Sequence, residues 1–239
     1  MEITRIDARI KLPIQPNMGI TPRSTPVIWF GNYERAKVCT ISINPSDKEF
    51  NPHSMLCSRD ELKKNDNDPL DDNDAIKVKE RCNNYFSGNP YKVWFDAFEH
   101  FLSKFGGYSY YDGTCVHCDM VQWATTPKWS DLPADVKEKH IKNDLPILKL
   151  LLEKDFEVMF INGRSVVDSV SEHLNIKLSI KPASINNKTI KIYTGEYKRT
   201  KVIGWNQPLQ GSVFNNFDTI DILCDLIKRS NHDNRTLSN

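Results

Sequence analysis

Apolar and polar positions along this chain follow two alternating patterns, one typical of strands and one typical of helices. Short runs rich in β-branched and aromatic residues predict buried strands at residues 27–30, 37–43, 114–123, 156–161, 189–193 and 200–203. Apolar residues at helical spacing predict helices at residues 91–105, 134–154, 165–174 and 219–229, with a break expected before Pro146. Strands that alternate with helices favour an α/β fold, a three-layer α/β/α sandwich around a central, mainly parallel sheet of about four strands.

Polar segments separate and flank these elements. Residues 1–36 are rich in Pro and are predicted to be largely irregular. Residues 59–84 are predicted to form a polar loop or insertion, and their acidic run lacks the Gly and the closing Glu of a calcium loop. Residues 230–239 predict a disordered tail. The 239 residues are enough for one full core, so we expect a single domain over residues 1–229, with two domains as the alternative.

Two of the predicted strands end in similar polar breaks. Residues 42–46 (Ser-Ile-Asn-Pro-Ser) close the first, and residues 204–212 (Gly-Trp-Asn-Gln-Pro-Leu-Gln-Gly-Ser) follow the last. An Asn-Pro step cannot continue a strand or begin a helix at the Asn. Ligands of open α/β sheets bind at the carboxyl ends of strands, so we expect Asn44 and Asn206 to face one crevice.

These residues, in this order, resemble the uracil-DNA glycosylase superfamily, whose first motif is of the Gly-x-Asn-Pro-Gly/Ser type and whose second is of the His/Asn-Pro-Ser type. Residues 86–94 (Phe-Ser-Gly-Asn-Pro-Tyr-Lys-Val-Trp) are similar to a segment of its mismatch-specific branch. Residues 158–165 (Val-Met-Phe-Ile-Asn-Gly-Arg-Ser) are similar to its penultimate strand. The resemblance covers residues 37–215 and extends to single-strand-selective members.

The chain departs from the family pattern at both motifs. Ser42 replaces the usual Gly of the first, and Gln207 stands where the second often has Pro. Two registers are therefore open at the second motif. Either Asn206 matches the family's His/Asn, or Pro208 matches its later Pro and Trp205 takes the His position.

The resemblance implies a monofunctional DNA glycosylase that hydrolyses the N-glycosidic bond of a flipped base, leaves an abasic site and needs no cofactor. Asn44 would position the attacking water, with Asp47 as the nearby carboxylate that could assist. Asn206 would donate to the base carbonyl O2, where negative charge accumulates. Phe86 would stack on the base. The residues expected to contact DNA are Pro208, Leu209, Gln210, Ser212, Lys198, Arg199 and Lys201.

Two of these residues also have plain structural interpretations. Asp47 could cap the turn that follows it, and Phe86 could be an ordinary core residue. Lys198, Arg199 and Lys201 could equally form a solvated edge.

Asp119 is the residue that most distinguishes between substrates. It stands where the family carries an Asn that reads uracil, and a carboxylate accepts from an exocyclic amine, as on the cytosine edge. A slip of one residue would instead make Asp119 a solvent-facing strand residue. Removal of ordinary cytosine would destroy the host genome, so the expected base is a hydroxymethylated or glucosylated cytosine of phage DNA, in antiviral defence. The small Ser46 and the polar insertion fit a pocket opened at C5.

Three other functions remain open. A repair glycosylase for uracil or a deaminated base would share Asn44, Phe86 and Asn206. A catalytically silent nucleic-acid-binding relative would share the fold and release no base. An unrelated α/β enzyme is the third alternative.

Composition adds limits on partners and location. A net charge of +1 means that any DNA contact comes from a local patch. No apolar run reaches the ~18 residues of a membrane span, and the opening residues lack a signal-peptide pattern, so we expect a cytoplasmic monomer without membrane contact. The six cysteines are expected to be reduced. Cys115 and Cys118 have the spacing of half a metal site that His53 and Cys57 could complete, but we interpret them as buried packing residues and expect no metal.

Overall fold

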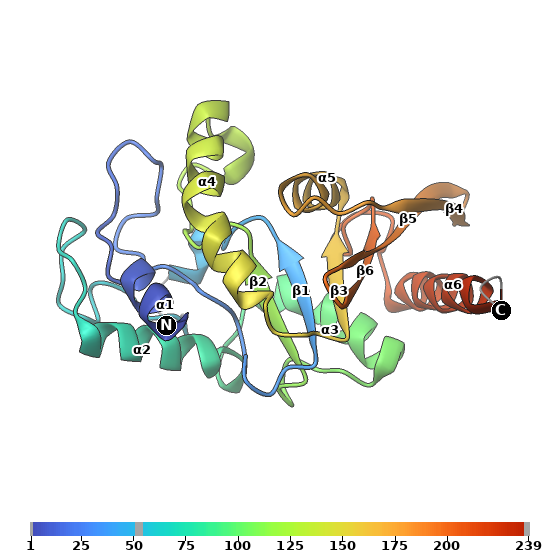
Figure 1. Cartoon of the computed structure of the whole chain (residues 1–239), viewed down its shortest axis with the longest axis horizontal. Helices are drawn as coiled ribbons and strands as arrows, with labels where there is room; N and C mark the ends of the chain where they lie inside the picture. The colour runs from blue at the N-terminus through green and yellow to red at the C-terminus, as the bar shows by residue number, and fades with distance from the viewer. Residues whose placement is uncertain (1, 51–54, 237–239) are drawn as a thin grey trace. The chain divides into compact units, whose positions relative to one another are not determined.

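The computed structural model describes residues 2–50 and 55–236 (Figure 1). These residues form an α/β fold with a six-stranded sheet in the order β2-β1-β3-β6-β5-β4. The α/β class is confirmed, whereas the expected number of about four strands is too small. The chain divides into two compact units, the first made of residues 1–35, 42–91 and 116–155 and the second of residues 36–41, 92–115 and 156–239.

The second unit contains most of the sheet. Its strands are β1 (Val38–Ser42, without its last residue), β3 (Val158–Asn162), β4 (Ser179–Ile185), β5 (Lys188–Tyr197) and β6 (Thr200–Trp205). β3 pairs in parallel with both β1 and β6, while β5 pairs antiparallel with β6 and β4. The buried strands β1 and β3 are the apolar runs that the sequence predicted, because a strand covered on both faces reads as continuous apolar residues.

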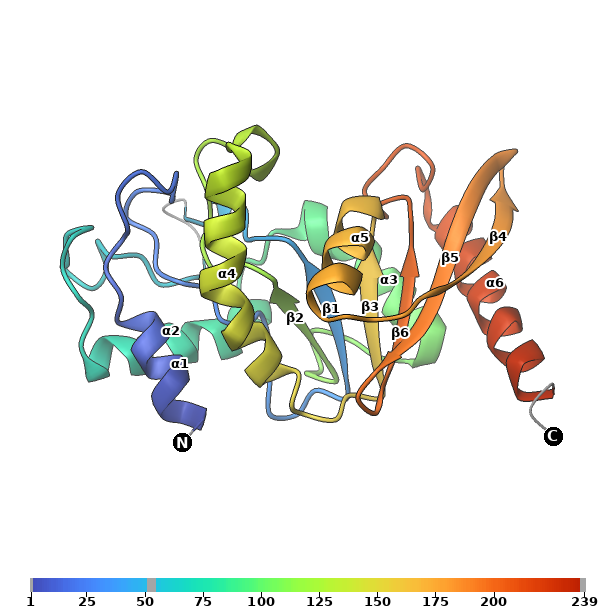
Figure 2. The same cartoon turned by 45° about the horizontal axis from the view of Figure 1, so that its top comes forward.

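Three helices pack against the strands of this unit. They are α3 (Lys92–Gly106), α5 (Arg164–His173) and α6 (Phe217–Thr236). α5 contacts β3 and β6, and α6 contacts α3 and β4. Figure 2 shows α5 on one side of β3 and β6, with α3 on the other. On the α3 side, Phe101 packs edge-to-face on Phe160 at a ring-centroid distance of 5.2 Å and lies 4.8 Å from Trp205.

The first unit is built from helices and turns around β2 (Cys115–Asp119). Its helices are α1 (Glu2–Ile10), α2 (Asp72–Asn83) and α4 (Ala134–Leu151), joined by the 3-10 turns η1 (Asp47–Phe50), η2 (Tyr85–Ser87) and η3 (Trp129–Asp131). A buried ion pair joins Arg9 of α1 to Asp144 of α4, and Asp144 also accepts from the backbone N–H of Gln122 at 2.9 Å. A buried charge needs such partners to stay charged, so this pair fixes α1 on α4.

Residues 59–84, expected to be a polar loop or insertion, are largely ordered around two features. The buried guanidinium of Arg59 donates to the carbonyls of Ser24, Leu12, Asn65 and Asp68. The acidic run then begins α2 instead of remaining a loop. Asp71 and Asp74 form a reciprocal capping box at its first turn, where carboxylates are favourable.

Several predicted boundaries were wrong. The N-terminal segment contains α1, and residues 27–30 contribute one bridge between Phe30 and His117 instead of a strand. The strand predicted at 114–123 ends at Asp119. The predicted break before Pro146 is absent from α4, whose buried Ile147, Leu148 and Leu151 hold the helix across the proline.

The C-terminal end also differs from the prediction. α6 continues to Thr236, so residues 230–236 of the expected disordered tail are helical, and residues 237–239 lie outside the described residues. Across the described helices, none is both long enough and apolar enough to cross a membrane.

Candidate functional site

Asn44 lies just beyond the end of β1, where two backbone hydrogen bonds hold the chain. The N–H groups of Met120 and Val121 donate to the carbonyls of Ser42 and Ile43 at 3.1 and 2.8 Å. The Asn44 side chain is half-buried. Its Nδ2 donates to Pro45 O at 3.0 Å, and lies 3.2 Å from Thr125 Oγ1 and 3.4 Å from Trp123 O.

These partners determine which way the Asn44 amide faces. Two of them are carbonyl oxygens, which only accept, so the NH₂ group must point toward them. The opposite atom, Oδ1, receives no hydrogen bond from the described residues. An amide fixed through its nitrogen in this way can hold a water through its oxygen.

Ser46 and Asp47 form the start of the turn η1. The Ser46 hydroxyl accepts from the backbone N–H of Lys48 at 3.2 Å and donates to Asp47 Oδ1 at 3.3 Å. The residue that caps this turn is therefore Ser46, and the structural role expected of Asp47 belongs to its neighbour. The Asp47 carboxylate is half-buried beside it.

A buried carboxyl that sequence reasoning missed lies on the same turn. Glu49 is 5 % exposed, and the hydroxyl of Tyr85 lies 2.7 Å from both of its carboxyl oxygens. Tyr85 in turn accepts from the backbone N–H of Tyr91 at 2.8 Å. Burial raises the pKa of Glu49 to about 7, with a smaller contribution from the charge of Asp119, although the Tyr85 hydrogen bond acts to lower it. Glu49 therefore exchanges a proton near neutral pH.

Asp119 is the last residue of β2 and is only 2 % exposed. The alternative of a solvent-facing Asp119 is therefore wrong. Its Oδ1 lies 3.3 Å from Nε2 of His117, which is equally buried, yet that oxygen accepts no hydrogen bond from the described residues. His117 is held in place by two backbone hydrogen bonds with Phe30, of 2.8 and 3.0 Å. The strand end thus presents a buried carboxylate oxygen that is short of a donor.

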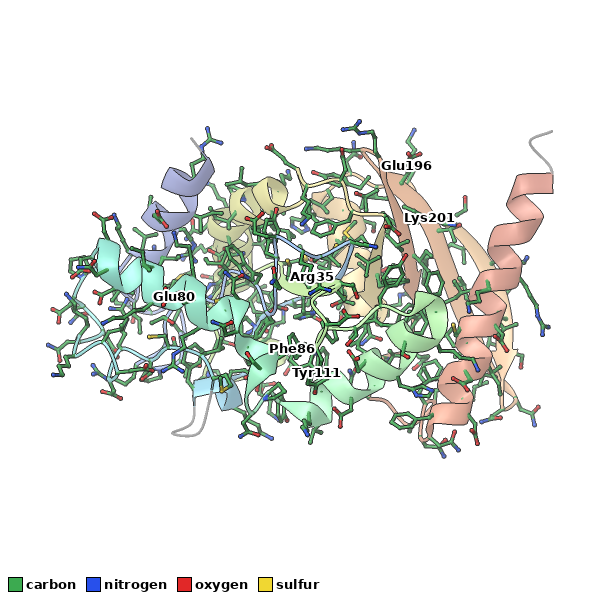
Figure 3. The ribbon with its side chains drawn as sticks, turned by 90° about the horizontal axis from the view of Figure 1, so that it is seen from below. Arg35, Glu80, Phe86, Tyr111, Glu196 and Lys201 are labelled. Carbon is green, nitrogen blue, oxygen red and sulfur yellow. The ribbon has the colours of Figure 1, made fainter. Side chains whose placement is uncertain are left out.

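Phe86 lies in η2, just beyond the end of α2, where Figure 3 labels it. Its ring is buried and packs edge-to-face on Tyr85 at a centroid distance of 5.0 Å. Tyr85 packs in the same way on Phe30 at 4.8 Å. This burial matches the core role that we considered for Phe86, while stacking on a base remains a prediction.

In the second unit, Asn206 and Trp205 differ sharply in what their side chains can do. Trp205 is fully buried, and its indole N–H donates to Asn162 Oδ1 at 2.7 Å. Asn206 is half-buried and exchanges hydrogen bonds with the backbone of Lys191, which donates to Oδ1 at 2.8 Å and accepts from the Asn206 N–H at 3.2 Å. With Oδ1 held, the Nδ2 group of Asn206 is oriented as a donor. Of the two registers, only the one that places Asn206 at the His/Asn position puts a side chain with an available hydrogen-bond donor there.

The loop after Asn206 is organised by Asn162, the last residue of β3 and a second residue that sequence reasoning missed. Its Oδ1 accepts from the Leu209 N–H at 2.9 Å, and its Nδ2 donates to Gln210 Oε1 at 3.0 Å. Gln210 Nε2 donates to Trp94 O at 2.7 Å. The side chain of Leu209 is 1 % exposed. Leu209 and Gln210 are therefore structural residues of this loop.

The other residues predicted to contact DNA are on the surface. Pro208 and Ser212 are exposed on the same loop. Lys198 and Arg199 are exposed at the turn between β5 and β6, and Lys201 is half-buried in β6 opposite Glu196.

The cysteines show no arrangement that indicates a metal site. All six are free and buried. Cys115 and Cys118 are three residues apart on β2, so their side chains point to opposite faces of the strand. Burial raises the pKa of the Cys118 thiol well above its usual range. His53 lies outside the described residues, and the part of the chain that is described contains no group of three or more His, Cys, Asp or Glu side chains placed to hold a metal ion.

A cavity of about 190 Å³ lies elsewhere in the first unit, against α1 and α4. Arg9, Trp123 and His140 line it, whereas Asn44, Asp119 and the other predicted site residues do not. The link between the cavity and these residues is Trp123, whose carbonyl oxygen lies 3.4 Å from Asn44 Nδ2.

The predicted site residues are thus shared between the two units. Asn44, Ser46, Asp47, Phe86 and Asp119 belong to the first, and Asn206 with the loop after it belongs to the second. Their convergence on one crevice remains a prediction. Compared with models of known protein families and with curated protein sequences, the chain matched none.

Proposed function

We propose that this chain is a monofunctional DNA glycosylase of the uracil-DNA glycosylase type, folded as a three-layer α/β/α sandwich, that removes a C5-modified cytosine from DNA. The substrate is a hydroxymethylated or glucosylated cytosine of phage DNA, and the role is antiviral defence. The observation that carries this proposal is the buried Oδ1 of Asp119, which no described residue supplies with a hydrogen bond.

The preference for the cytosine edge follows from the missing hydrogen-bond donor to Oδ1 of Asp119. A buried polar atom without a partner costs about 1–3 kcal/mol, so a ligand that supplies a donor is favoured. The exocyclic amine of cytosine is such a donor, whereas O4 of uracil, at the same position, is an acceptor and would repel the carboxylate oxygen. Because uracil N3–H is also a donor, the preference depends on this oxygen facing position 4 of the base. Asp119 therefore favours cytosine and disfavours uracil.

The water is assigned to Asn44. Its NH₂ group is fixed by Pro45, Trp123 and Thr125, which leaves Oδ1 to accept a hydrogen bond from a water molecule and to orient the lone pair of that water outward. The water oxygen forms a bond to C1′ as the bond from C1′ to the base nitrogen breaks. The electron pair leaves with the base, and the proton released by the water neutralises it. An amide can orient a water molecule but cannot deprotonate it. Orientation alone is enough when the sugar is already close to an oxocarbenium ion, because such a cation reacts with neutral water.

The departing base is assigned to Asn206. The Lys191 N–H holds its Oδ1, so its Nδ2 can donate to the base O2, where negative charge develops. Stacking on the base is assigned to Phe86, and the C5 side of the base is assigned to Ser46 because that residue is small.

The test measures abasic sites in four duplexes that differ in one base: uracil, cytosine, hydroxymethylcytosine or glucosylated hydroxymethylcytosine. We expect base release from one or both modified cytosines and none from ordinary cytosine. Efficient release of uracil with no release of either modified cytosine would assign the chain to uracil repair. Binding of all four duplexes without release would make it a silent relative.

A further inference from the structure

Positive charge is concentrated in one short part of the second unit. Between residues 177 and 201 the chain has seven basic residues, Lys177, Lys181, Lys188, Lys191, Lys198, Arg199 and Lys201, and one acidic residue, Glu196. This segment therefore carries a formal charge of +6, whereas the whole chain carries +1. Such segregation marks a candidate surface for an anionic partner.

This segment folds into an antiparallel ribbon that extends beyond the rest of the sheet. β4 and β5 pair from Ser179 opposite Thr194 to Ile185 opposite Lys188. Asn186 and Asn187 form the two-residue turn between them, with φ of 48° and 60°, the conformation that suits the twist of a hairpin and that Asn tolerates. β6 pairs with β5 only from Ile192 onward. The half of the ribbon next to the turn is therefore two-stranded, and β4 forms its outer edge.

The two faces of the ribbon have different surroundings. Ile185, Ile190 and Ile192 share one face and are buried, and α6 packs against β4. Lys181 and Lys188 lie opposite Ile192 and Ile185, so their exposed side chains leave from the same face. The opposite face carries Ile180, Pro182, Ser184, Thr189 and Lys191, all exposed. We call this the open face of the β4–β5 ribbon. It has a single large apolar side chain, Ile180, so it is not an apolar surface for protein docking.

Some of the acidic side chains near this segment already have basic partners. Glu196 lies opposite Lys201 in the β5–β6 register, as Figure 3 shows. On α6, Asp221 is engaged by His100 and Lys104. Two further acids, Asp218 and Asp225, lie on the same helix, which contacts β4. Among the described residues, Lys177, Lys188 and Lys191 have no acidic partner.

We propose that the β4–β5 ribbon binds the phosphate backbone of duplex DNA through these lysines. A two-stranded ribbon has the width to enter the major groove, where phosphates flank it on both sides. Lys191 connects the ribbon to the proposed chemistry, since its backbone is hydrogen-bonded to both the N–H and the Oδ1 of Asn206. The choice of DNA as the anionic partner rests on the proposed function. The positive charge and the geometry of the ribbon are independent of that function.

The experiment compares two triple variants with equal changes in charge. The ribbon variant is Lys177→Gln, Lys188→Gln, Lys191→Gln. The matched control is Lys128→Gln, Lys142→Gln, Lys149→Gln, three exposed lysines of the first unit. Fluorescence anisotropy measures the affinity of each protein for an unmodified duplex of about 20 base pairs, between about 50 and 200 mM salt.

The ribbon variant should bind at least ~10-fold more weakly at about 100 mM salt, and the slope of log K against log[salt] should become shallower by about 2–3, one unit per lost phosphate contact. The control should stay within about twofold of wild type. Arginine at the same three ribbon positions should restore affinity, because charge and not the lysine itself is responsible. Thermal unfolding shows that each variant is folded.

Equal salt slopes for wild type and the ribbon variant would overturn the proposal, as would loss of affinity in the arginine variant. Tighter, ribbon-dependent binding of vesicles containing phosphatidylserine than of DNA would also overturn it, in favour of a membrane surface. Because the duplex is unmodified, binding is scored without base release. Ribbon-dependent binding without glycosylase activity would therefore reject the proposed function and leave this inference standing.

Discussion

The amide of Asn44 is held on one side only, and this asymmetry is what suits it to positioning a water. Its nitrogen is fixed by groups from two segments, whereas its oxygen has no donor among the described residues. The Asn-Pro break predicted the place of this residue, because that step must end a strand. The orientation of the amide could not be predicted, because its partners Trp123 and Thr125 are distant in sequence.

Asn44→Ala should lower the rate of base release by about 100-fold or more while leaving DNA affinity nearly unchanged, because the amide acts only in the reacting complex. Single-turnover kinetics and a binding titration on the same duplex measure the two quantities. Asn89→Ala, at an exposed asparagine, is the matched control and should change neither. Parallel losses of binding and turnover would make Asn44 a structural turn residue.

Glu49 shows a limit of local sequence patterns at the residue scale. A Glu in a polar turn is usually exposed, and nothing adjacent to it signals the long-range contact with Tyr85 that buries it. Its pKa nevertheless affects the whole protein. The folded value of about 7 lies above the ordinary 4.5, so the native state keeps a proton that the unfolded chain has lost.

Stability should therefore fall as pH rises from 4.5 to about 7, by up to about 3 kcal/mol, and level off above that. Glu49→Gln should remove the part of this dependence that Glu49 causes, and the variant should be more stable than wild type at about pH 8, because the amide keeps an acceptor for Tyr85 without a charge. Burial also raises the pKa of Asp144, so a smaller dependence of the same sign should remain. Urea unfolding across this pH range measures the effect. The exposed Glu138→Gln should leave the wild-type slope intact, and an unchanged slope in Glu49→Gln would contradict this account.

At the scale of elements, the sequence predicted most of the buried strands and helices and missed those whose residues are polar. β1, β3, α3 and α5 contain apolar residues at the required period. α2 was interpreted as a loop because its acidic start resembles a solvated run, although carboxylates stabilise a helix N-terminus. β4 was missed because most of its residues are exposed, so it lacks the alternation of a half-buried strand.

The loop that follows Asn206 depends on one residue of β3. Asn162 accepts from Trp205 and Leu209 and donates to Gln210, so Asn162→Ala leaves three polar groups without their partner. The free energy of unfolding should fall by about 2–4 kcal/mol. Asn215→Ala, at an exposed asparagine near the end of the same loop, should cost less than about 0.5 kcal/mol. If Asn162→Ala lowers the free energy of unfolding as little as the control does, the loop keeps its conformation without the hydrogen bonds of Asn162.

At the scale of the whole molecule, the proposed function divides between the two units. The first contains the residues assigned to the water and to the base edge, Asn44 and Asp119, and the second contains Asn206 and the basic ribbon. In this proposal the identity of the substrate rests on the first unit, because Asp119 is the residue assigned to distinguish an amine from a carbonyl. The near-zero net charge accords with this division, since the proposal assigns the affinity for DNA to one charged segment.

The exchange Asp119→Asn tests the central claim most directly, because it restores an amide that can donate to uracil O4 and accept from its N3–H. Release of free base is measured from two oligonucleotides that differ in one base, uracil or a C5-modified cytosine, for wild type and variant. Wild type should act on the modified cytosine, and the variant should lose this activity and gain activity on uracil, by about 1–3 kcal/mol of discrimination. If wild type releases uracil and ignores the modified cytosine, Asp119 does not read the base and the account is wrong.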